Sequence, residues 1–194
     1  IANLAKTTKG TYYEKRNYAV YESHEPGSTF KVMAMMAALE DKVIDTSTVV
    51  DTQKGTKRFY GRTISDSQNG GYGKISVARA FEVSSNTGIV KVIHNSYKDK
   101  PSKFVDGLYR MNLRDTLKLS IKGEGKPIIP DPRIKNKRWS GIALEWMAYG
   151  YGVSFTPLQT LNAGEYIALN GSQFSSNGNL YINTSKNVFA FQGI

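Results

Sequence analysis

Residues 28–40 are apolar on nearly every face of a helix and contain neither glycine nor proline. A helix without a polar face must be surrounded by other elements of the fold. The turn residues Pro26 and Gly27 come directly before this segment and mark where it begins. We therefore predict a buried central helix, and the rest of the chain has to supply the elements that cover it.

Five more helices are predicted around that central helix. They are residues 76–83, 87–96, 103–120, 141–149 and 156–170. The last of them carries a complete start signal. Thr156 can cap it, Pro157 suits its first helical position, and Gln159 can complete a capping box.

The sequence patterns that predict strands are weaker than those that predict helices. Residues 11–13 and 49–52 are predicted as short strands, and residues 180–191 as a hairpin or an edge strand. Proline and glycine make residues 121–138 a long irregular connection. At 194 residues the chain is one domain or a large piece of one. The prediction is a mostly helical body with small amounts of sheet at both ends.

Composition excludes several kinds of site. The chain has no cysteine and two histidines, so disulfide scaffolds, thiol nucleophiles and cysteine-based metal sites are excluded. We expect neither a metal nor another cofactor. No apolar run approaches the ~20 residues of a membrane span. The chain begins at Ile1 without a targeting segment, and we expect it to be an excised piece of a longer protein.

Positive charge concentrates in residues 91–138, which hold 13 basic and 5 acidic side chains, in a chain whose net charge is +10. Clustered lysine and arginine can neutralise nucleic-acid phosphates. This stretch, however, has few aromatic residues and no recognisable nucleic-acid-binding motif. A solvated basic face, or attraction to an anionic cell-envelope surface, explains the same residues. We therefore expect no nucleic-acid partner.

Ser28 and Lys31 are the first candidates for chemistry. Three residues apart on a helix, their side chains lie about 60° apart around the axis. A serine hydroxyl needs a base to take its proton, and lysine can act as one when burial lowers its pKa. The positive end of a helix favours the neutral amine, and its free N–H groups can hold an oxyanion. The pair suits acyl transfer, although serine at a helix start is more often only a cap.

Ser84, Ser85 and Asn86 form a second polar cluster, between two predicted helices. A hydroxyl and an amide on such a loop can relay a proton and orient a substrate that contains an amide. Alone, the same residues are a common capping and turn composition. Their occurrence together with Ser28 and Lys31 favours a function.

In this order, these segments resemble the penicillin-binding proteins, the serine D,D-transpeptidases that cross-link peptidoglycan. Residues 25–31, Glu-Pro-Gly-Ser-Thr-Phe-Lys, resemble the active-site serine motif, and residues 81–88 resemble the S-x-N segment. Residues 149–159 resemble the glycine turn and helix start beyond it. The resemblance extends over residues 1–171, and residues 171–194 match poorly. Its details are most similar to the class B, monofunctional enzymes of division or elongation, of a Bacteroides-like bacterium.

The resemblance implies an α+β fold, the α/β sandwich of the penicillin-recognising serine enzymes. It implies that Ser28 is the acylated nucleophile and that Lys31 is its general base. It further implies that Ser84 shuttles protons and that Asn86 binds the substrate amide. The implied substrates are D-Ala-D-Ala stem peptides, with β-lactam antibiotics as inhibitors. Division or elongation proteins are implied partners, at an extracytoplasmic location that depends on a membrane anchor outside this chain.

The family's third motif, K-[ST]-G on a strand, does not occur in the 194 residues. Residues 9–11 and 54–56 contain Lys, Gly and Thr in another order. We therefore expect residues 1–194 to be a partial domain that lacks outer sheet strands at both ends and has an impaired active site. A catalytically silent scaffold module remains an alternative. So do a D,D-carboxypeptidase, a serine β-lactamase and a β-lactam sensor within the same superfamily.

Overall fold

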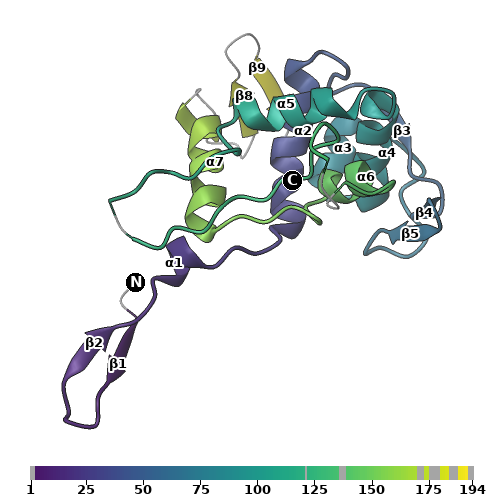
Figure 1. Ribbon diagram of the computed structural model, residues 1–194. Helices are drawn as coiled ribbons and strands as arrows, with labels where there is room; N and C mark the ends of the chain where they lie inside the picture. Colours follow the sequence, from purple (N-terminus) through teal and green to yellow (C-terminus); the bar gives the residue numbers. More distant parts are fainter. Residues whose placement is uncertain are drawn as a thin grey trace.

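A central apolar helix organises the body of the protein. The computed structural model describes residues 3–120, 122–135, 139–169, 173–174, 180–183 and 188–191. Within these residues, α2 (Lys31–Glu40) packs against α4 (Asn86–Tyr97), α5 (Pro101–Arg110) and α6 (Ala143–Ala148). Eight of its ten residues are buried. The prediction of a surrounded apolar helix is confirmed, and Figure 1 shows α2 enclosed within the helical body.

The start of the central helix differs from the prediction. Residues Gly27–Phe30 form a 3-10 turn, η1, and the α-helix itself begins at Lys31. In a 3-10 turn, side chains three residues apart lie almost directly above one another. The side chains of Ser28 and Lys31 therefore leave the backbone in more nearly the same direction than they would on an α-helix.

Side-chain caps mark the starts of several helices. α3 (Val77–Glu82) is capped by Ser76, whose hydroxyl accepts a hydrogen bond from the amide of Arg79 at 3.1 Å. At α7 (Pro157–Leu169), Thr156 N donates to Gln159 Oε1 at 2.9 Å, and Gln159 N donates to Thr156 Oγ1 at 3.2 Å. The predicted capping box is thus confirmed. None of the described helices is both long enough and apolar enough to cross a membrane.

The helix predicted at residues 103–120 was drawn too long, because α5 ends at Arg110. Asn112 has a φ of 57°, in the left-handed region that commonly ends a helix. The irregular connection therefore begins about ten residues earlier than predicted.

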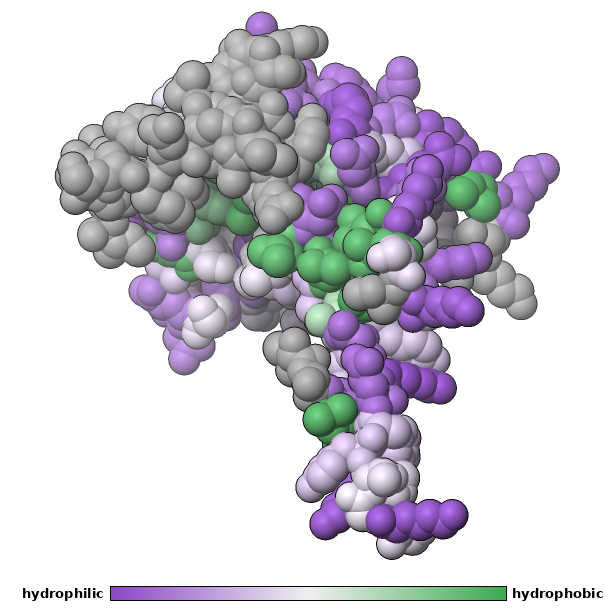
Figure 2. All heavy atoms as spheres, turned by 90° about the vertical axis from the view of Figure 1, so that its left-hand side faces the viewer, coloured by the Kyte–Doolittle hydropathy of each residue, from purple (hydrophilic) through white to green (hydrophobic). Residues whose placement is uncertain are grey.

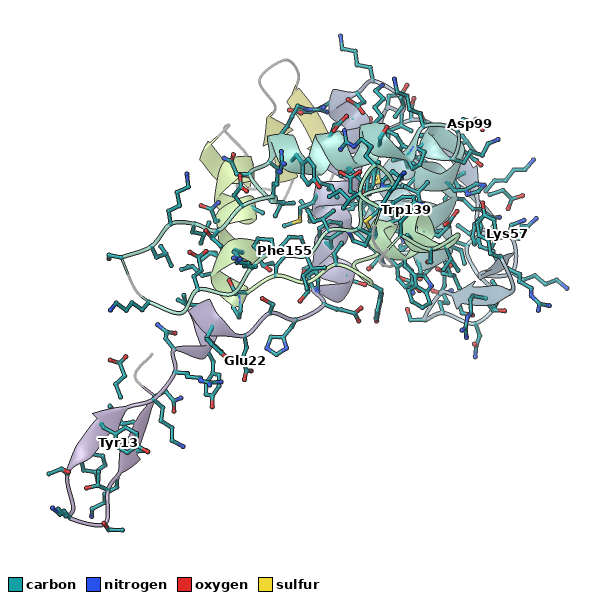
Figure 3. The ribbon with its side chains drawn as sticks, viewed as in Figure 1. Tyr13, Glu22, Lys57, Asp99, Trp139 and Phe155 are labelled. Atoms are coloured by element: carbon teal, nitrogen blue, oxygen red, sulfur yellow. The ribbon has the colours of Figure 1, made fainter. Side chains whose placement is uncertain are left out.

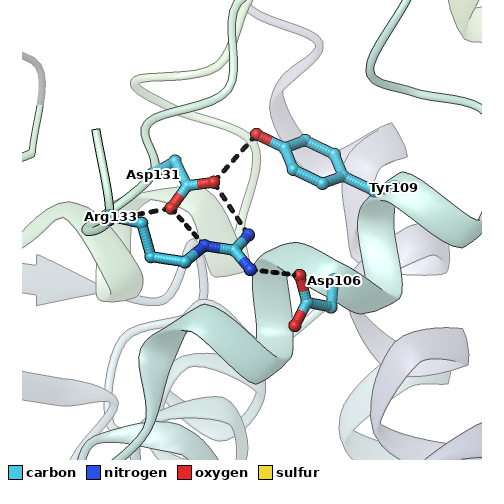
Figure 4. A network of polar contacts seen from close by, with 4 residues as sticks. All are labelled: Asp106, Tyr109, Asp131 and Arg133. Carbon is cyan, nitrogen blue, oxygen red and sulfur yellow. Dashed lines mark hydrogen bonds and ion pairs between the residues drawn. The ribbon is translucent and has the colours of Figure 1, made fainter.

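A polar network holds this connection to α5 (Figure 4). The buried carboxylate of Asp131 accepts hydrogen bonds from Arg133 Nε at 2.9 Å and Nη2 at 2.8 Å, and from the Tyr109 hydroxyl at 3.1 Å. Arg133 Nη1 also reaches Asp106 Oδ1 on α5 at 2.7 Å. The Arg133 hydrogen bonds hold the pKa of Asp131 below its ordinary value. Charge-assisted contacts thus fix a segment that has no regular secondary structure.

The strands form small antiparallel sheets. The pairs are β1 (Leu4–Lys6) with β2 (Tyr12–Glu14), β3 (Val49–Asp51) with β6 (Lys74–Ser76), β4 (Thr56–Phe59) with β5 (Arg62–Ser65), and β8 (Leu180–Asn183) with β7 (Gln173–Phe174) and β9 (Val188–Phe191). The strands predicted at 11–13, 49–52 and 180–191 are confirmed. The hairpin of β4 and β5 was missed, so sheet is also present in the middle of the chain. Its turn residues Tyr60 and Gly61 both have positive φ, as a two-residue type I′ turn requires.

The β1–β2 hairpin projects away from the helical body, next to the short helix α1 (Tyr18–Tyr21), and Tyr13 lies on it (Figures 1 and 3). Figure 2 views the molecule from this side. Hydrophobic atoms gather on the body above the hairpin, and the hairpin itself is mostly hydrophilic or intermediate in hydropathy. The candidate site residues lie in the body: Ser28 on η1, Lys31 at the start of α2, Ser84 on the loop between α3 and α4, and Asn86 at the start of α4.

Candidate active site

Lys31 is the buried polar centre of the candidate site, with 1% of its surface exposed. Its Nζ donates hydrogen bonds to Ser84 O at 2.6 Å, to Ser84 Oγ at 2.9 Å and to Asn86 Oδ1 at 2.6 Å. An ammonium group has three protons, so these contacts use all of them. Three of the four residues predicted from the sequence therefore meet at one nitrogen.

Burial makes the ammonium form of Lys31 less stable than it is in water. Burial lowers the pKa of Lys31 from 10.5 to about 8, and the carboxylate of Asp66 acts in the opposite direction. The hydrogen-bond acceptors on Ser84 and Asn86 are all uncharged. A lysine with a pKa near neutrality can exist as a free base at physiological pH, which is what proton abstraction from a hydroxyl requires.

Ser28 lies on η1, three residues before Lys31, and is exposed. Within the part of the chain that the structure describes, its hydroxyl makes no hydrogen bond. Of the pair, only Lys31 lies inside the helical body, and Ser28 lies at the surface. The exposed hydroxyl of Ser28 is accessible to a substrate, whereas the amine of Lys31 is shielded from water.

The segment before Ser28 is held by a second glycine turn. Gly27 N donates to Gly150 O at 3.1 Å, and the Glu25 carboxylate accepts a hydrogen bond from Gly152 N at 2.8 Å. Gly150 has a φ of 89°, and a Cβ at this position would overlap the carbonyl group of Gly27. The two backbones can approach this closely only because residue 150 is glycine.

Aromatic packing and a backbone bridge extend this contact. His24 and Phe155 exchange backbone hydrogen bonds of 2.8 Å and 3.0 Å. Phe155, labelled in Figure 3, stacks on Phe30 with ring centroids 5.7 Å apart. Residues 149–156 therefore support η1 from a distant part of the sequence.

The loop from Ser84 to Thr87 is also held from outside. Ser84 has a φ of 52°, a left-handed conformation that is uncommon for serine. The Asp66 carboxylate accepts hydrogen bonds from Thr87 N and Thr87 Oγ1 at 2.8 Å each, and from Ser85 Oγ at 3.1 Å. Asn86 Nδ2 donates to Ser65 O at 2.8 Å.

Sequence reasoning did not identify Asp66 or the Ser65 carbonyl as part of the site. Asp66 and Thr87 are 21 residues apart, with α3 between them, so no helical or strand spacing connects them. Only the fold of the β4–β5 hairpin brings the two residues together.

In chemical terms, the site combines an accessible hydroxyl, a buried amine of low pKa, a second hydroxyl bonded to that amine, and an amide side chain. This arrangement suits nucleophilic acyl transfer. Among the described residues, no cluster of three or more histidine, aspartate or glutamate side chains is placed to hold a metal ion.

Comparison with known protein families agrees with this chemistry. Residues 2–175 match the family model of the penicillin binding protein transpeptidase domain. The chain is 31% identical over 157 residues to the peptidoglycan D,D-transpeptidase FtsI of Escherichia coli strain K12, a match that covers 81% of this chain and 24% of that protein. It is 28% identical over 156 residues to the stage V sporulation protein D of Bacillus subtilis strain 168, a match that covers 80% of this chain and 23% of that protein. The chain thus spans about a quarter of the length of these relatives.

Solved structures share the fold. The apo transpeptidase domain of penicillin-binding protein 3 from Burkholderia pseudomallei aligns with a TM-score of 0.69 and 24% identity, over 91% of this chain and 50% of that one. A peptidoglycan glycosyltransferase from Burkholderia ambifaria aligns with a TM-score of 0.70 and 24% identity, over 94% of this chain and 55% of that one. The mixed α/β fold expected from the sequence is therefore confirmed.

Proposed function

Because the chain belongs to the penicillin-binding protein transpeptidase domain family, we propose that Ser28 is the acylated nucleophile of a peptidoglycan D,D-transpeptidase. The observation that carries the proposal is the position of Lys31. Its amine is buried, has a lowered pKa and is bonded to Ser84 and Asn86, three residues after an exposed serine.

In the first half of the proposed reaction, neutral Lys31 takes the Ser28 proton while Ser28 Oγ attacks the carbonyl carbon between the two D-alanines of a stem peptide. The C–N bond then breaks. The leaving amine of the terminal D-alanine receives a proton from Lys31 through Ser84 Oγ, which lies 2.9 Å from Nζ. An ester on Ser28 and a free D-alanine are the products of this half-reaction.

In the second half, an amine of a neighbouring stem peptide attacks the ester. The new amide bond forms, the Ser28 ester bond breaks, and the proton of the attacking amine returns to Ser28 through Lys31. A β-lactam would acylate Ser28 in the same way. Its leaving nitrogen stays tethered to the acyl group, so the adduct should persist.

Asn86 has a donor left for the substrate. Its Oδ1 accepts from Lys31 and one proton of Nδ2 is donated to Ser65 O, but an amide nitrogen carries two protons. We propose that the second proton binds a carbonyl oxygen of the stem peptide or the antibiotic.

We further propose that the parent protein works outside the cytoplasm, at the outer face of the cytoplasmic membrane, through an anchor that is not part of these 194 residues. Its stem-peptide substrates are located there, and division or elongation proteins are its proposed partners. Because K-[ST]-G is absent from the sequence, we expect this chain alone to be acylated more slowly than a longer chain that contains the motif.

The decisive experiment is intact-protein mass spectrometry after incubation with benzylpenicillin, with Ser28→Ala as the control. We expect one penicilloyl adduct that the variant lacks. An adduct only on a longer chain that includes K-[ST]-G would support the family function and show that the motif completes the site. No adduct on either chain would refute the proposal in favour of a catalytically silent scaffold module.

Acylation should depend on pH through Lys31. The pKa of Lys31 is about 8, so the amine is mostly protonated below that pH and cannot accept the Ser28 proton. The acylation rate should therefore rise about tenfold per pH unit below the pKa and level off above it. Measuring the rate of adduct formation between pH 6 and pH 9 tests this expectation, and a flat profile would contradict it.

A further inference from the structure

The loop that carries Ser84 and Asn86 has two anchors. Lys31 binds it through Ser84 and Asn86, and the end of the β4–β5 hairpin binds it through Ser65 and Asp66. The second anchor lies at the end of β5, outside the site residues that the sequence predicted.

The Asp66 carboxylate makes an unusually complete set of contacts. Its two oxygens together accept from a backbone amide and from two hydroxyl groups, on Thr87 and Ser85. Thr87 and Ser85 are buried, and Ser85 Oγ in turn accepts from Gly88 N at 2.9 Å to cap α4. The backbone of Asp66 is fixed as well, because its N–H donates to Gly55 O at 2.8 Å. Asp66 therefore connects the hairpin firmly to the first turn of α4.

We propose that Asp66 is a positioning residue of the active site, which holds Ser85 and Thr87 so that Ser84 and Asn86 stay within hydrogen-bonding distance of Lys31. The inference rests on the proposed function of Ser28 and Lys31. It explains how the left-handed conformation of Ser84 is maintained, since strained backbone conformations persist only where surrounding contacts determine them.

The charge of Asp66 adds a second effect. Its carboxylate stabilises the ammonium form of Lys31 and so acts against the effect of burial on the Lys31 pKa. Asp66 thereby keeps the pKa of Lys31 higher than burial alone would leave it. Among the described helices that pack against α2, Lys91 also interacts with Asp66, while its amine donates to the Asp51 carbonyl. The remaining ionisable side chains of these helices contact other partners: His94 contacts Glu145, Lys103 and Arg110 contact Asp41, and Asp106 contacts Arg133.

Asp66→Asn tests both effects in the full chain. The substitution removes the charge and one strong acceptor with little change of size. We expect acylation by benzylpenicillin to slow about 100-fold, as small misplacements of catalytic groups do. We also expect the midpoint of the pH profile to fall, because a carboxylate that stabilises the ammonium form of Lys31 has been neutralised.

Asp45→Asn is the matched control. The Asp45 carboxylate also accepts hydrogen bonds from backbone amides and hydroxyl groups, but its partners are its neighbours Ser47 and Thr48. We expect this variant to keep the wild-type rate and the wild-type midpoint.

Thr87→Val separates position from charge, because it removes one hydrogen bond to Asp66 and leaves the carboxylate in place. Acylation should slow about tenfold, roughly the value of one hydrogen bond to a charged group, while the midpoint stays unchanged. Thr87→Ser should restore the rate.

Hydrogen exchange at the amides of Thr87 and Gly88 gives a readout that does not depend on acylation. These amides should exchange faster in Asp66→Asn than in Asp45→Asn. The inference about Asp66 would be overturned if Asp66→Asn kept the wild-type acylation rate, the wild-type pH midpoint and the wild-type amide exchange. It would also be overturned if acylation slowed while the pH midpoint and the amide exchange stayed unchanged. Failure of the proposed function would differ, because the wild-type protein itself would form no adduct at Ser28. The exchange comparison alone would then decide whether Asp66 holds the loop.

Discussion

Replacing Lys31 with methionine should slow acylation of Ser28 by about three to four orders of magnitude, the upper range for loss of a general base. Methionine has a similar length and can occupy the buried position of the side chain, but it cannot accept a proton. The substitution also leaves Ser84 and Asn86 without the donor that they share. The measurement is the rate of penicilloyl adduct formation, together with circular dichroism to show that the variant is folded.

Two comparisons make this result specific. Lys91→Met removes a lysine that also donates to a backbone carbonyl, Asp51 O at 2.6 Å, but lies outside the site, and we expect it to be acylated at the wild-type rate. Lys31→Arg keeps a positive charge that cannot be released at any accessible pH, so it should be as slow as Lys31→Met. Acylation of Lys31→Met within tenfold of the wild-type rate would exclude Lys31 as the base.

Gly150→Ala should destabilise the protein by about 4 kcal/mol, because the overlap of the new Cβ with the backbone of Gly27 adds to the strain of a positive φ. The new Cβ would meet the carbonyl group of Gly27, so the two turns have to separate. The hydrogen bond between Gly27 N and Gly150 O would be lost, and Ser28 would shift with its neighbour. For a chain of this size, thermal unfolding should occur roughly 10 °C lower.

Gly152→Ala is the matched control for this effect. Gly152 also has a positive φ, of 71°, but open space surrounds the position of its Cβ. Its substitution should cost about 1 kcal/mol, from backbone strain alone. Equal losses of stability in the two variants would show that the contact between residues 27 and 150 is unimportant.

Local signals predicted much of this fold. The apolar pattern of residues 28–40 identified the central helix, and Thr156 with Gln159 marked the start of α7 correctly. The errors have physical reasons. The pattern of apolar residues continues beyond Arg110, but Asn112 adopts a left-handed conformation that ends the helix. The β4–β5 turn was missed because Tyr60 occupies a position where asparagine or glycine is the usual signal.

The candidate site was predictable only in part. Ser84 and Asn86 were named from the sequence, and the structure places both on Lys31. The exposure of Ser28 was not predicted, because it depends on the 3-10 turn that precedes α2. Asp66 gave no signal, because its contacts depend on the packing of a hairpin against a helix that is distant in the sequence.

The burial of Lys31 separates its basicity from its reactivity toward electrophiles. An amine with a pKa of about 8 is partly unprotonated near neutral pH, and an unprotonated amine can react with an acylating reagent that reaches it. The resulting amide would be permanent and would inactivate the enzyme, whereas an ester on serine can be opened again by the next amine. With 1% of its surface exposed, Lys31 is shielded from a strained lactam that reaches Ser28. In the proposed reaction, the fold therefore shields the base, Lys31, from the electrophile that acylates Ser28.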